Sequence, residues 1–497
     1  MSLECESHPG RCRWLRGLSS RLVLASVVLA GAALPAEALP LFARQTGQNC
    51  VACHAGGQFP ELTPYGRMFK LTGYTIGQRT TIPLSAMVLA SNSRVANTSK
   101  SDDPSQDFQK QGQTILATAS LFLGGKVTEN VGGFAQITYD PYASQSADGS
   151  FHGHSNVDNV DVRYADHFVG PDRDLVIGVS VNNNPSVSDP WNTAPAWMQY
   201  VPVPSPTSSR FIDGAAPYPG YAAGSNIAGI TAYGFWKRTW YAELGAYGSS
   251  RGAFSVMHAG ISSDALTKLS GLNPYWRLAW NHEWGPHSLE IGTSGMIARI
   301  YDNPLDTSDS ATLHRTRDLL VDTQYQYLLE PHSWTAQLVY QRSRHRYPDT
   351  LSNQPAAFVD AFGNALPNTN ARDSSTVLRG KLTYVYRAKY GSSLGLFHAG
   401  GSTNTANQTS GYSPDTLSIT SDPVAQAPSV RVSGNLSGNP ATSGGTLEAF
   451  WMPLQYVRIG AQYTAYTRFN GASVNYDGFG RNARDNNSLF IYLWAAY

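Results

Sequence analysis

The chain has 497 residues and a net charge of +1, from 36 basic and 35 acidic side chains. This balance excludes a protein that binds nucleic acid through a basic surface, because phosphate binding needs a clear basic excess. No run of about 18 apolar residues occurs, which excludes membrane-spanning helices. A β-barrel is not excluded, because strands with alternating faces average to a soluble-looking hydropathy.

Residues 1–38 are predicted to be a secretory signal peptide. Several arginines precede an apolar run over 22–34, and the small-residue motif Ala36-Glu37-Ala38 follows it. The apolar run is too short to span a bilayer. We therefore expect export, with cleavage after Ala38.

Cleavage removes Cys5 and Cys12 and leaves two cysteines, Cys50 and Cys53, in the mature chain. With His54 they form Cys50-Val51-Ala52-Cys53-His54, the C-x-x-C-H pattern of c-type haem attachment. Two thiols at this spacing reach both vinyl groups of one haem, and the adjacent imidazole then meets the iron. We expect one covalent haem c.

Other uses of the pair fit less well. A redox C-x-x-C is expected within a βαβ unit, which the surrounding sequence does not show. A structural zinc site needs a second pair of Cys or His ligands, and the sequence offers none nearby.

Residues 39–83 are predicted to form a small haem-binding, cytochrome c-like plug. Its aromatic residues are candidates for packing a porphyrin: Phe42, Phe59, Tyr65, Phe69 and Tyr74. One helix is predicted over 63–72, with Thr63 as N-cap and Pro64 at its first position. Met68 is a candidate sixth iron ligand, although packing as an ordinary apolar side chain is the simpler role; Met87, a distant histidine or an open iron site are alternatives. So short a segment cannot bury a haem alone, and we expect it inside the following domain.

Residues 84–497 predict a 16-stranded antiparallel outer-membrane β-barrel, with both termini in the periplasm. Apolar and polar residues alternate over sixteen segments, separated by short and long connections in turn. The predicted strands are 84–92, 113–124, 131–140, 156–168, 174–182, 227–236, 239–249, 272–284, 287–301, 315–329, 333–346, 374–388, 392–403, 443–452, 455–468 and 488–497. Tryptophans near strand ends suit the aromatic girdles of the lipid–water interface: Trp236, Trp240, Trp284, Trp334 and Trp451.

The N-terminal residues also resemble a known family. The stretch ALPLFARQTGQNCVACH over 38–54, then Phe59-Pro60-Glu61-Leu62, Gly66-Arg67-Met68-Phe69-Lys70 and Gly73-Tyr74, is similar to the motif of fused outer-membrane cytochrome–porins. That family includes iron-oxidising outer-membrane monohaem c-type cytochromes. The resemblance implies thioether bonds at Cys50 and Cys53, and His54 as the proximal iron ligand. It covers about 37 residues, and the barrel matches only in strand number and order.

The resemblance implies an outer-membrane electron conduit. Such a protein oxidises extracellular Fe(II) at its haem and passes electrons to a periplasmic c-type cytochrome, an activity of the iron:cytochrome c reductase type. Acidic loop residues are candidate Fe(II) contacts, although ordinary solvated acids are the more common explanation: Asp102, Asp103, Asp107, Asp306 and Asp309. The alternatives are a porin for small solutes or metal ions with a structural or sensory haem, and a small haem enzyme such as a peroxidase.

Overall fold

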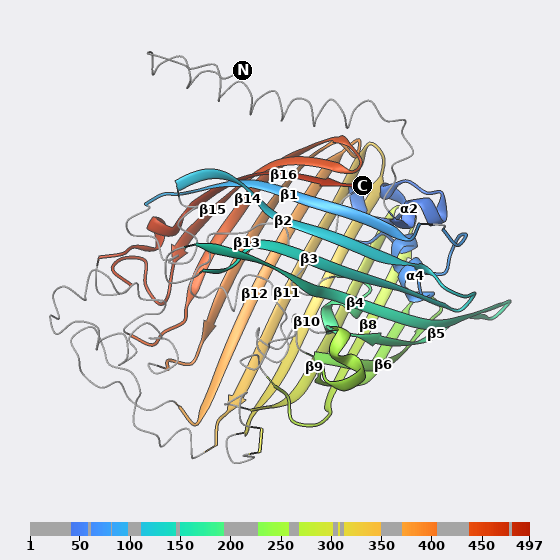
Figure 1. Cartoon of the computed structure of the whole chain (residues 1–497), viewed down its shortest axis with the longest axis horizontal. Coiled ribbons are helices and arrows are strands. Elements are labelled where there is room, and N and C mark those ends of the chain that lie inside the picture. The colour runs from blue at the N-terminus through green and yellow to red at the C-terminus, as the bar shows by residue number, and fades with distance from the viewer. Residues whose placement is uncertain are drawn as a thin grey trace, which may run out of the picture.

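Sixteen antiparallel strands pair in chain order within the described part of the chain, and β1 pairs with β16 to close the barrel (Figure 1). The computed structural model describes residues 41–57, 61–80, 82–97, 111–145, 150–192, 227–257, 268–301, 307–308, 313–348, 370–404, 437–476 and 480–497. The strands are β1 (Leu84–Val95), β2 (Gln111–Lys126), β3 (Val131–Gln145), β4 (Phe151–Gly170), β5 (Arg173–Asn182), β6 (Ile227–Trp236), β7 (Trp240–Ser249), β8 (Asn273–Trp284), β9 (His287–Tyr301), β10 (Leu313–Leu329), β11 (His332–Arg346), β12 (Arg372–Tyr386), β13 (Tyr390–Gly401), β14 (Thr442–Leu454), β15 (Val457–Arg468) and β16 (Ser488–Ala496).

The strand number and the alternation of short and long connections are confirmed. All short connections lie at one end of the barrel, which we call the turn end, and the long ones lie at the opposite, loop end. Because the strand number is even, the chain enters and leaves the barrel at the turn end. In outer-membrane barrels the short turns face the periplasm.

Two predicted turns were placed wrongly by about two residues. The connection between β12 and β13 was predicted at 389–391, but Arg387 and Ala388 make the turn with φ of 53° and 50°. Two-residue hairpins need positive φ at both central positions, which glycine usually supplies, and here two non-glycine residues adopt it. The β14–β15 connection was likewise predicted at 453–454 and lies after Leu454. Strands β3 and β4 extend further toward the loop end than predicted.

The two faces of the wall differ in polarity as predicted. Along β10, Leu319 and Val321 are exposed on the outside, whereas Asp318, Asp322 and Gln324 are buried on the inside. The five tryptophans of the predicted girdle are all exposed near the turn end. An apolar outside and a polar inside identify a barrel that faces lipid. The chain is therefore an outer-membrane barrel of the 16-strand, porin-like architecture.

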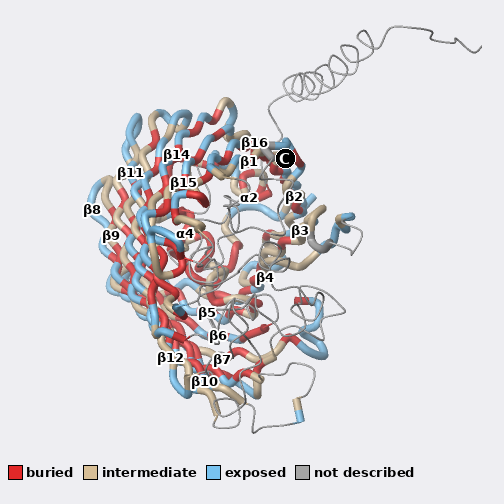
Figure 2. The backbone as a smooth tube through the Cα atoms, turned by 90° about the vertical axis from the view of Figure 1, so that its left-hand side faces the viewer, coloured by how far each residue is buried: buried red, intermediate tan, exposed pale blue. Residues whose placement is uncertain are grey.

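The N-terminal segment (residues 41–57 and 61–80) folds into short helices at the turn end, within the ring of strands (Figures 1 and 2). It contains α2 (Leu41–Thr46), α3 (Cys50–Cys53), the 3-10 turn η1 (Ala55–Gly57) and α4 (Pro64–Leu71). Helix α4 was predicted, including its Thr63 N-cap, whose hydroxyl accepts a hydrogen bond from Gly66 N at 3.1 Å. The prediction that α4 is the only helix of this segment was wrong. Helices α2 and α3 are too short to show helical periodicity in the sequence. No helix among the described residues is both long and apolar enough to cross a bilayer.

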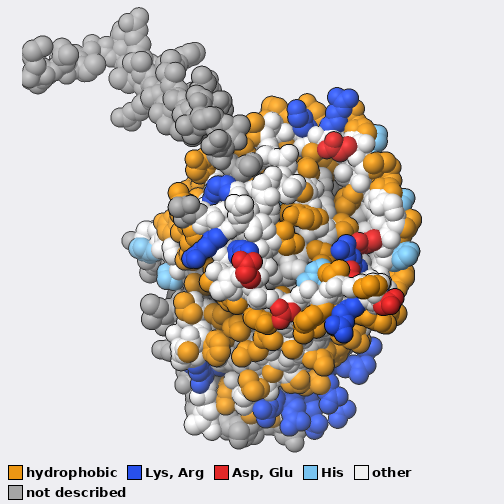
Figure 3. Space-filling model, turned by 90° about the vertical axis from the view of Figure 1, so that its right-hand side faces the viewer, with side chains coloured by type: hydrophobic (Ala, Val, Ile, Leu, Met, Phe, Trp, Pro, Cys, Tyr) orange, Lys and Arg blue, Asp and Glu red, His pale blue; other side chains and the backbone are white. Residues whose placement is uncertain are grey.

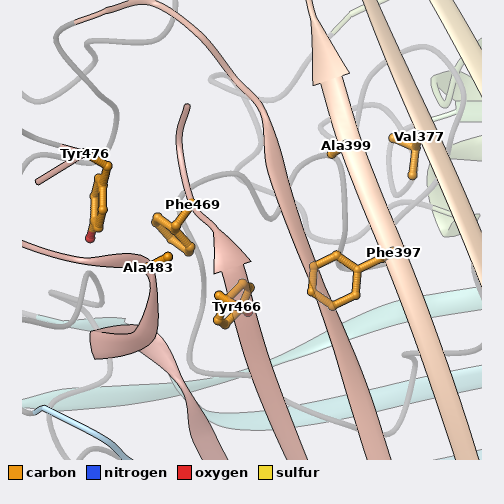
Figure 4. Packing of buried hydrophobic residues seen from close by; sticks show 7 residues of the cluster. All are labelled: Val377, Phe397, Ala399, Tyr466, Phe469, Tyr476 and Ala483. Atoms are coloured by element: carbon orange, nitrogen blue, oxygen red, sulfur yellow. The ribbon is translucent and has the colours of Figure 1, made fainter. Parts of the chain in front are cut away.

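One further short segment packs inside the barrel, and two 3-10 turns follow later in the chain. After β5, the chain forms α6 (Pro185–Ser188) and places Trp191, which is fully buried, against residues of β5, β6 and β7. Between β7 and β8 lies the 3-10 turn η4 (Gly252–Met257), and η6 (Ala483–Asn486) precedes β16. At the loop end, one apolar cluster joins β12, β13 and β15 to the segment that follows β15 (Figure 4). Its members are Val377, Phe397, Ala399, Tyr466, Phe469, Tyr476 and Ala483.

Candidate functional site

Both cysteines lie on α3, a single helical turn at the turn end of the barrel. Cys50 is buried, Cys53 is half-buried, and neither forms a disulfide. The Gln455 side chain, from the β14–β15 turn, accepts a hydrogen bond from Cys50 N at 3.2 Å and so fixes the start of the helix. His54 follows as the C-cap, with its backbone N–H bonded to Cys50 O at 2.8 Å. One turn of helix thus presents both thiols and the imidazole in the order that haem attachment requires.

The chain then returns and packs α4 directly onto α3. Ala55 N donates to Glu61 O and Thr63 N donates to Cys53 O, both at 2.9 Å. A Cβ atom added at Gly66 would lie 2.2 Å from Cys53 O, so only glycine allows this approach of the two helices. The glycine of the Gly66-Arg67-Met68 motif therefore sets the position of the cysteine helix.

The electrostatics of the three residues suit iron ligation by His54 and do not suit a redox-active dithiol. Burial lowers the pKa of His54 to about 4, so the imidazole is neutral at physiological pH and can donate its lone pair to iron. Burial raises the pKa of Cys50, and burial together with the neighbouring Cys50 raises that of Cys53 to about 11. Redox-active dithiols have a lowered pKa instead. Within the described residues, no group of three His, Cys, Asp or Glu side chains comes together as a metal site. The donor set therefore fits a c-type haem better than a redox pair or a zinc ion.

Three of the predicted haem-packing aromatics pack on one another and on the wall. The Phe42 ring lies 4.9 Å from Phe69 and stacks on Tyr74 at 5.5 Å, measured between ring centroids. Phe134 of β3 continues the cluster, 6.2 Å from Phe42. Tyr65 is partly exposed on α4, while Phe59 lies outside the described residues. The cluster attaches the N-terminal segment to the β2–β3 side of the barrel.

Arg67 joins α4 to the opposite part of the wall. It is only 2% exposed, and its guanidinium donates to Gln326 Oε1 at 3.0 Å and to Ser288 Oγ at 2.7 Å. It also donates to Leu62 O at 3.0 Å and lies 3.4 Å from a Glu283 carboxylate oxygen. A buried guanidinium needs such a set of partners, because an uncompensated buried charge is strongly destabilising.

Lys70 connects the same helix to the segment after β5. The residue is 7% exposed, and its ammonium donates to Asp189 O at 2.8 Å. The Asp189 carboxylate in turn lies 3.1 Å from Arg277 of β8, which also pairs with Asp322 of β10 at 2.8 Å. Burial lowers the pKa of Lys70 to about 8, with nearby Arg163 acting in the same direction.

Two further polar contacts strengthen the attachment. Glu61 accepts from Lys381 of β12 at 2.9 Å. The Tyr74 hydroxyl donates to Asp161 at 2.6 Å, and Asp161 pairs with Arg163 at 2.8 Å, both inside the barrel wall. The sequence indicated no role for Glu61, Arg67 and Lys70 beyond their place in a motif, and it predicted Tyr74 only as a residue that packs a porphyrin. Charged residues within an otherwise compact, glycine-rich segment are the signal that points to buried partners.

Met68 packs against the cluster of Leu71, Val176 and Trp191. This contact shows where the side chain lies without testing whether it binds iron, so its role as sixth ligand stays a prediction. Met87 lies in a separate inward-facing cluster of β1 and β16. Met452, near the end of β14, is buried with Val385, and Val385 lies against Gly56.

The predicted signal peptide and the acidic loop residues Asp102, Asp103, Asp107, Asp306 and Asp309 lie outside the described residues. Figure 3 looks onto the turn end, where acidic, basic and apolar side chains are intermixed around and across the face.

No known family model matches the sequence, and no curated protein matches it. Solved outer-membrane proteins are similar over most of the chain. Salmonella typhi OmpF, in complex with daunomycin, has a TM-score of 0.43 and 11% identity, covering 83% of this chain and 97% of that one. The outer-membrane channel DcaP of Acinetobacter baumannii has a TM-score of 0.41 and 11% identity, covering 83% and 96%. OmpT of Vibrio cholerae has a TM-score of 0.40 and 8% identity, covering 84% of this chain and 99% of that one. At these values the assignment of the fold rests on the strand pairing of this chain itself.

Proposed function

We propose that this porin-like barrel carries one covalent haem c in its lumen and transfers electrons across the outer membrane. The observation that supports this most directly is the α3 turn, which presents Cys50, Cys53 and a neutral His54 at the turn end while the wall fixes both helices around it. Cys50 and Cys53 would hold the haem through thioether bonds, and His54 would be the proximal ligand. A haem bound there supplies reversible one-electron chemistry at its iron.

The surrounding residues keep this element in place and limit access of water to it. Gln455 holds the start of α3, and Gly66 allows α4 to lie against it. Arg67 holds α4 to the wall, and Lys70 holds it to the segment after β5. Fixed ligands and a buried setting keep the reorganisation that accompanies electron transfer small. The turn end is also the periplasmic end, which suits delivery of electrons to a soluble periplasmic c-type cytochrome.

Extracellular Fe(II) is proposed as the donor on the N-terminal resemblance. The test is an optical redox titration of the purified protein, followed by anaerobic addition of Fe(II). We expect a c-type spectrum that is lost in Cys50→Ala and Cys53→Ala, and reduction of the haem by Fe(II). His332→Ala, at an exposed histidine of the turn end, is the matched control for His54→Ala and should keep the wild-type spectrum. A protein without covalent haem after expression with cytochrome c maturation factors would refute the proposal. A haem that Fe(II) leaves oxidised would remove only the iron donor.

The second candidate is a porin for small solutes or metal ions, with a structural or sensory haem. The observation that favours it is the barrel itself, whose 16-strand closed architecture is that of outer-membrane channels. Planar-bilayer conductance separates the two functions. A solute porin conducts, and continues to conduct in Cys50→Ala. An electron conduit whose lumen holds the N-terminal segment conducts little.

A further inference from the structure

A hollow lies on the wall of the barrel at the turn end, between β2, β3 and β4. It has a volume of about 710 Å³ and extends from the strands to the linker that joins the N-terminal segment to β1. Its apolar lining includes Leu123 of β2 and Val162 of β4, which are 41% and 43% exposed on the lipid-facing side. The hollow is therefore open to the bilayer, and the cysteine helix contributes no residue to its lining.

Small residues on β3 create this hollow. Gly133 and Ala135 line it, and a larger apolar side chain at Ala135 would fill the space beside Leu123 and Val162. At Gly133 the Val162 side chain already covers the strand, because an added Cβ atom would lie 3.3 Å from Val162 Cγ2, so the depth of the hollow depends on Ala135. In a membrane such a recess loses dispersion contacts unless a hydrocarbon chain enters it. An acyl chain has the chemistry and the shape to do so.

Two cations border the hollow on its polar side. Arg79, in the linker, is exposed, and Lys126 lies at the end of β2. Lys126 also pairs with Glu129 at 2.6 Å, but that carboxylate is 86% exposed. The Lys126 side chain itself is 15% exposed, and an ion pair with one solvent-exposed partner contributes little to stability. An exposed carboxylate beside two cations leaves a net positive edge at the level where lipid headgroups lie.

An apolar recess below a pair of cations matches one chemical class, a phosphodiester attached to acyl chains. We propose that this hollow is a binding site for a glycerophospholipid of the periplasmic leaflet. Arg79 and Lys126 bind its phosphate, and one acyl chain lies along Leu123, Ala135 and Val162. The site is independent of the haem and of the electron-transfer function proposed above.

Native mass spectrometry of the full-length protein in mild detergent tests this site, with phosphatidylethanolamine and phosphatidylglycerol supplied in equal amounts. The double variant Arg79→Gln/Lys126→Gln removes the phosphate contacts, and Ala135→Phe fills the recess. Arg173→Gln/Lys237→Gln, at exposed basic residues of other turns, and Ala461→Phe, on the exposed outer face of β15, are the matched controls. Heat-dependent mobility on gels verifies that every variant forms a closed barrel.

We expect one lipid to remain bound to the wild type and to both controls, and its occupancy to fall at least fivefold in both test variants. Retention of both headgroups to the same extent supports recognition through the phosphate, and preference for one headgroup identifies that lipid as the ligand. Unchanged occupancy in both test variants overturns the site. Loss in Ala135→Phe alone overturns phosphate recognition by Arg79 and Lys126. Loss only in the double variant overturns the acyl recess. If Ala135→Phe does not form a closed barrel, the comparison of the double variant with its control decides whether lipid binds at this site.

Discussion

Arg67 is expected to hold the N-terminal segment in the barrel, and Arg67→Met should release it. Methionine keeps most of the side-chain length but removes the charge and the donors to Leu62 O, Gln326 Oε1 and Ser288 Oγ. Hydrogen bonds from charged donors contribute about 1.5–3 kcal/mol each. The contributions of these hydrogen bonds do not add fully. When the segment leaves the barrel, the arginine regains the hydration that it lost on burial. Glu283 is partly exposed, so its share of the interaction is screened.

From these terms we expect a loss of about 3 kcal/mol, at the lower limit for breaking a buried charged contact. That corresponds to a roughly hundredfold increase in the fraction of molecules with an undocked segment. Hydrogen exchange followed by mass spectrometry measures this directly, because the backbone amides of α4 should exchange about a hundredfold faster in Arg67→Met. Arg173→Met, at an exposed arginine on the same end of the barrel, is the control and should leave exchange unchanged.

The barrel strands serve as an internal reference in the same experiment. Faster exchange confined to the N-terminal segment is expected, because the strands pair with one another independently of α4. Equal exchange of α4 in Arg67→Met and wild type would refute the reasoning, since it would mean that the buried contacts contribute nothing to docking. Faster exchange throughout the barrel would also contradict it, by showing that Arg67 stabilises the wall rather than the segment.

Three further predictions concern the same segment. Gly66→Ala should lower the yield of covalent haem, measured from the Soret absorbance per protein, because the added Cβ collides with Cys53 O, whereas Gly234→Ala, which meets only one backbone oxygen at 3.9 Å, should not. Trp191→Ala should lower the free energy of unfolding by about 3–5 kcal/mol, read from denaturant-induced changes in near-ultraviolet circular dichroism, because it empties a fully buried site; a loss below 1 kcal/mol would contradict this. Met68→Leu should leave the haem spectrum and potential unchanged if packing is the role of Met68, and a lower potential in this variant would establish it as the iron ligand instead.

The barrel could be predicted from sequence because its signal is local and repeated. Side chains two positions apart in a strand lie on the same face, so the polarity of its neighbours shows whether Val321 or Asp322 faces lipid or lumen. Sixteen segments repeat this two-residue period. Turn positions were predicted wrongly where the turn lacks the residues that usually mark it. The β12–β13 turn takes positive φ at Arg387 and Ala388 without a glycine to mark it.

The contacts of the candidate site could not be predicted in the same way. The cysteines and His54 lie within five consecutive positions, and their spacing is visible in the chain. Arg67 and Gln326 are separated by 259 residues, and Cys50 and Gln455 by 405. No local pattern specifies which barrel residue will face a given residue of the segment, since that depends on how the barrel closes and where the helices enter it. Only the presence of a charge that must be satisfied was visible beforehand.

The contacts also explain why so many specific residues surround Cys50 and Cys53. Thioether attachment and ligation need three residues, yet the motif that resembles the cytochrome–porins continues past position 70. In this structure Gly66 sets the distance between α3 and α4, and Arg67, Lys70 and Tyr74 each bind a residue of the barrel or of the segment after β5. These residues therefore dock the segment into the barrel, independently of what the cysteines bind. Arg67 shows this most clearly, because its guanidinium is buried against partners that the barrel wall supplies, Gln326 and Ser288.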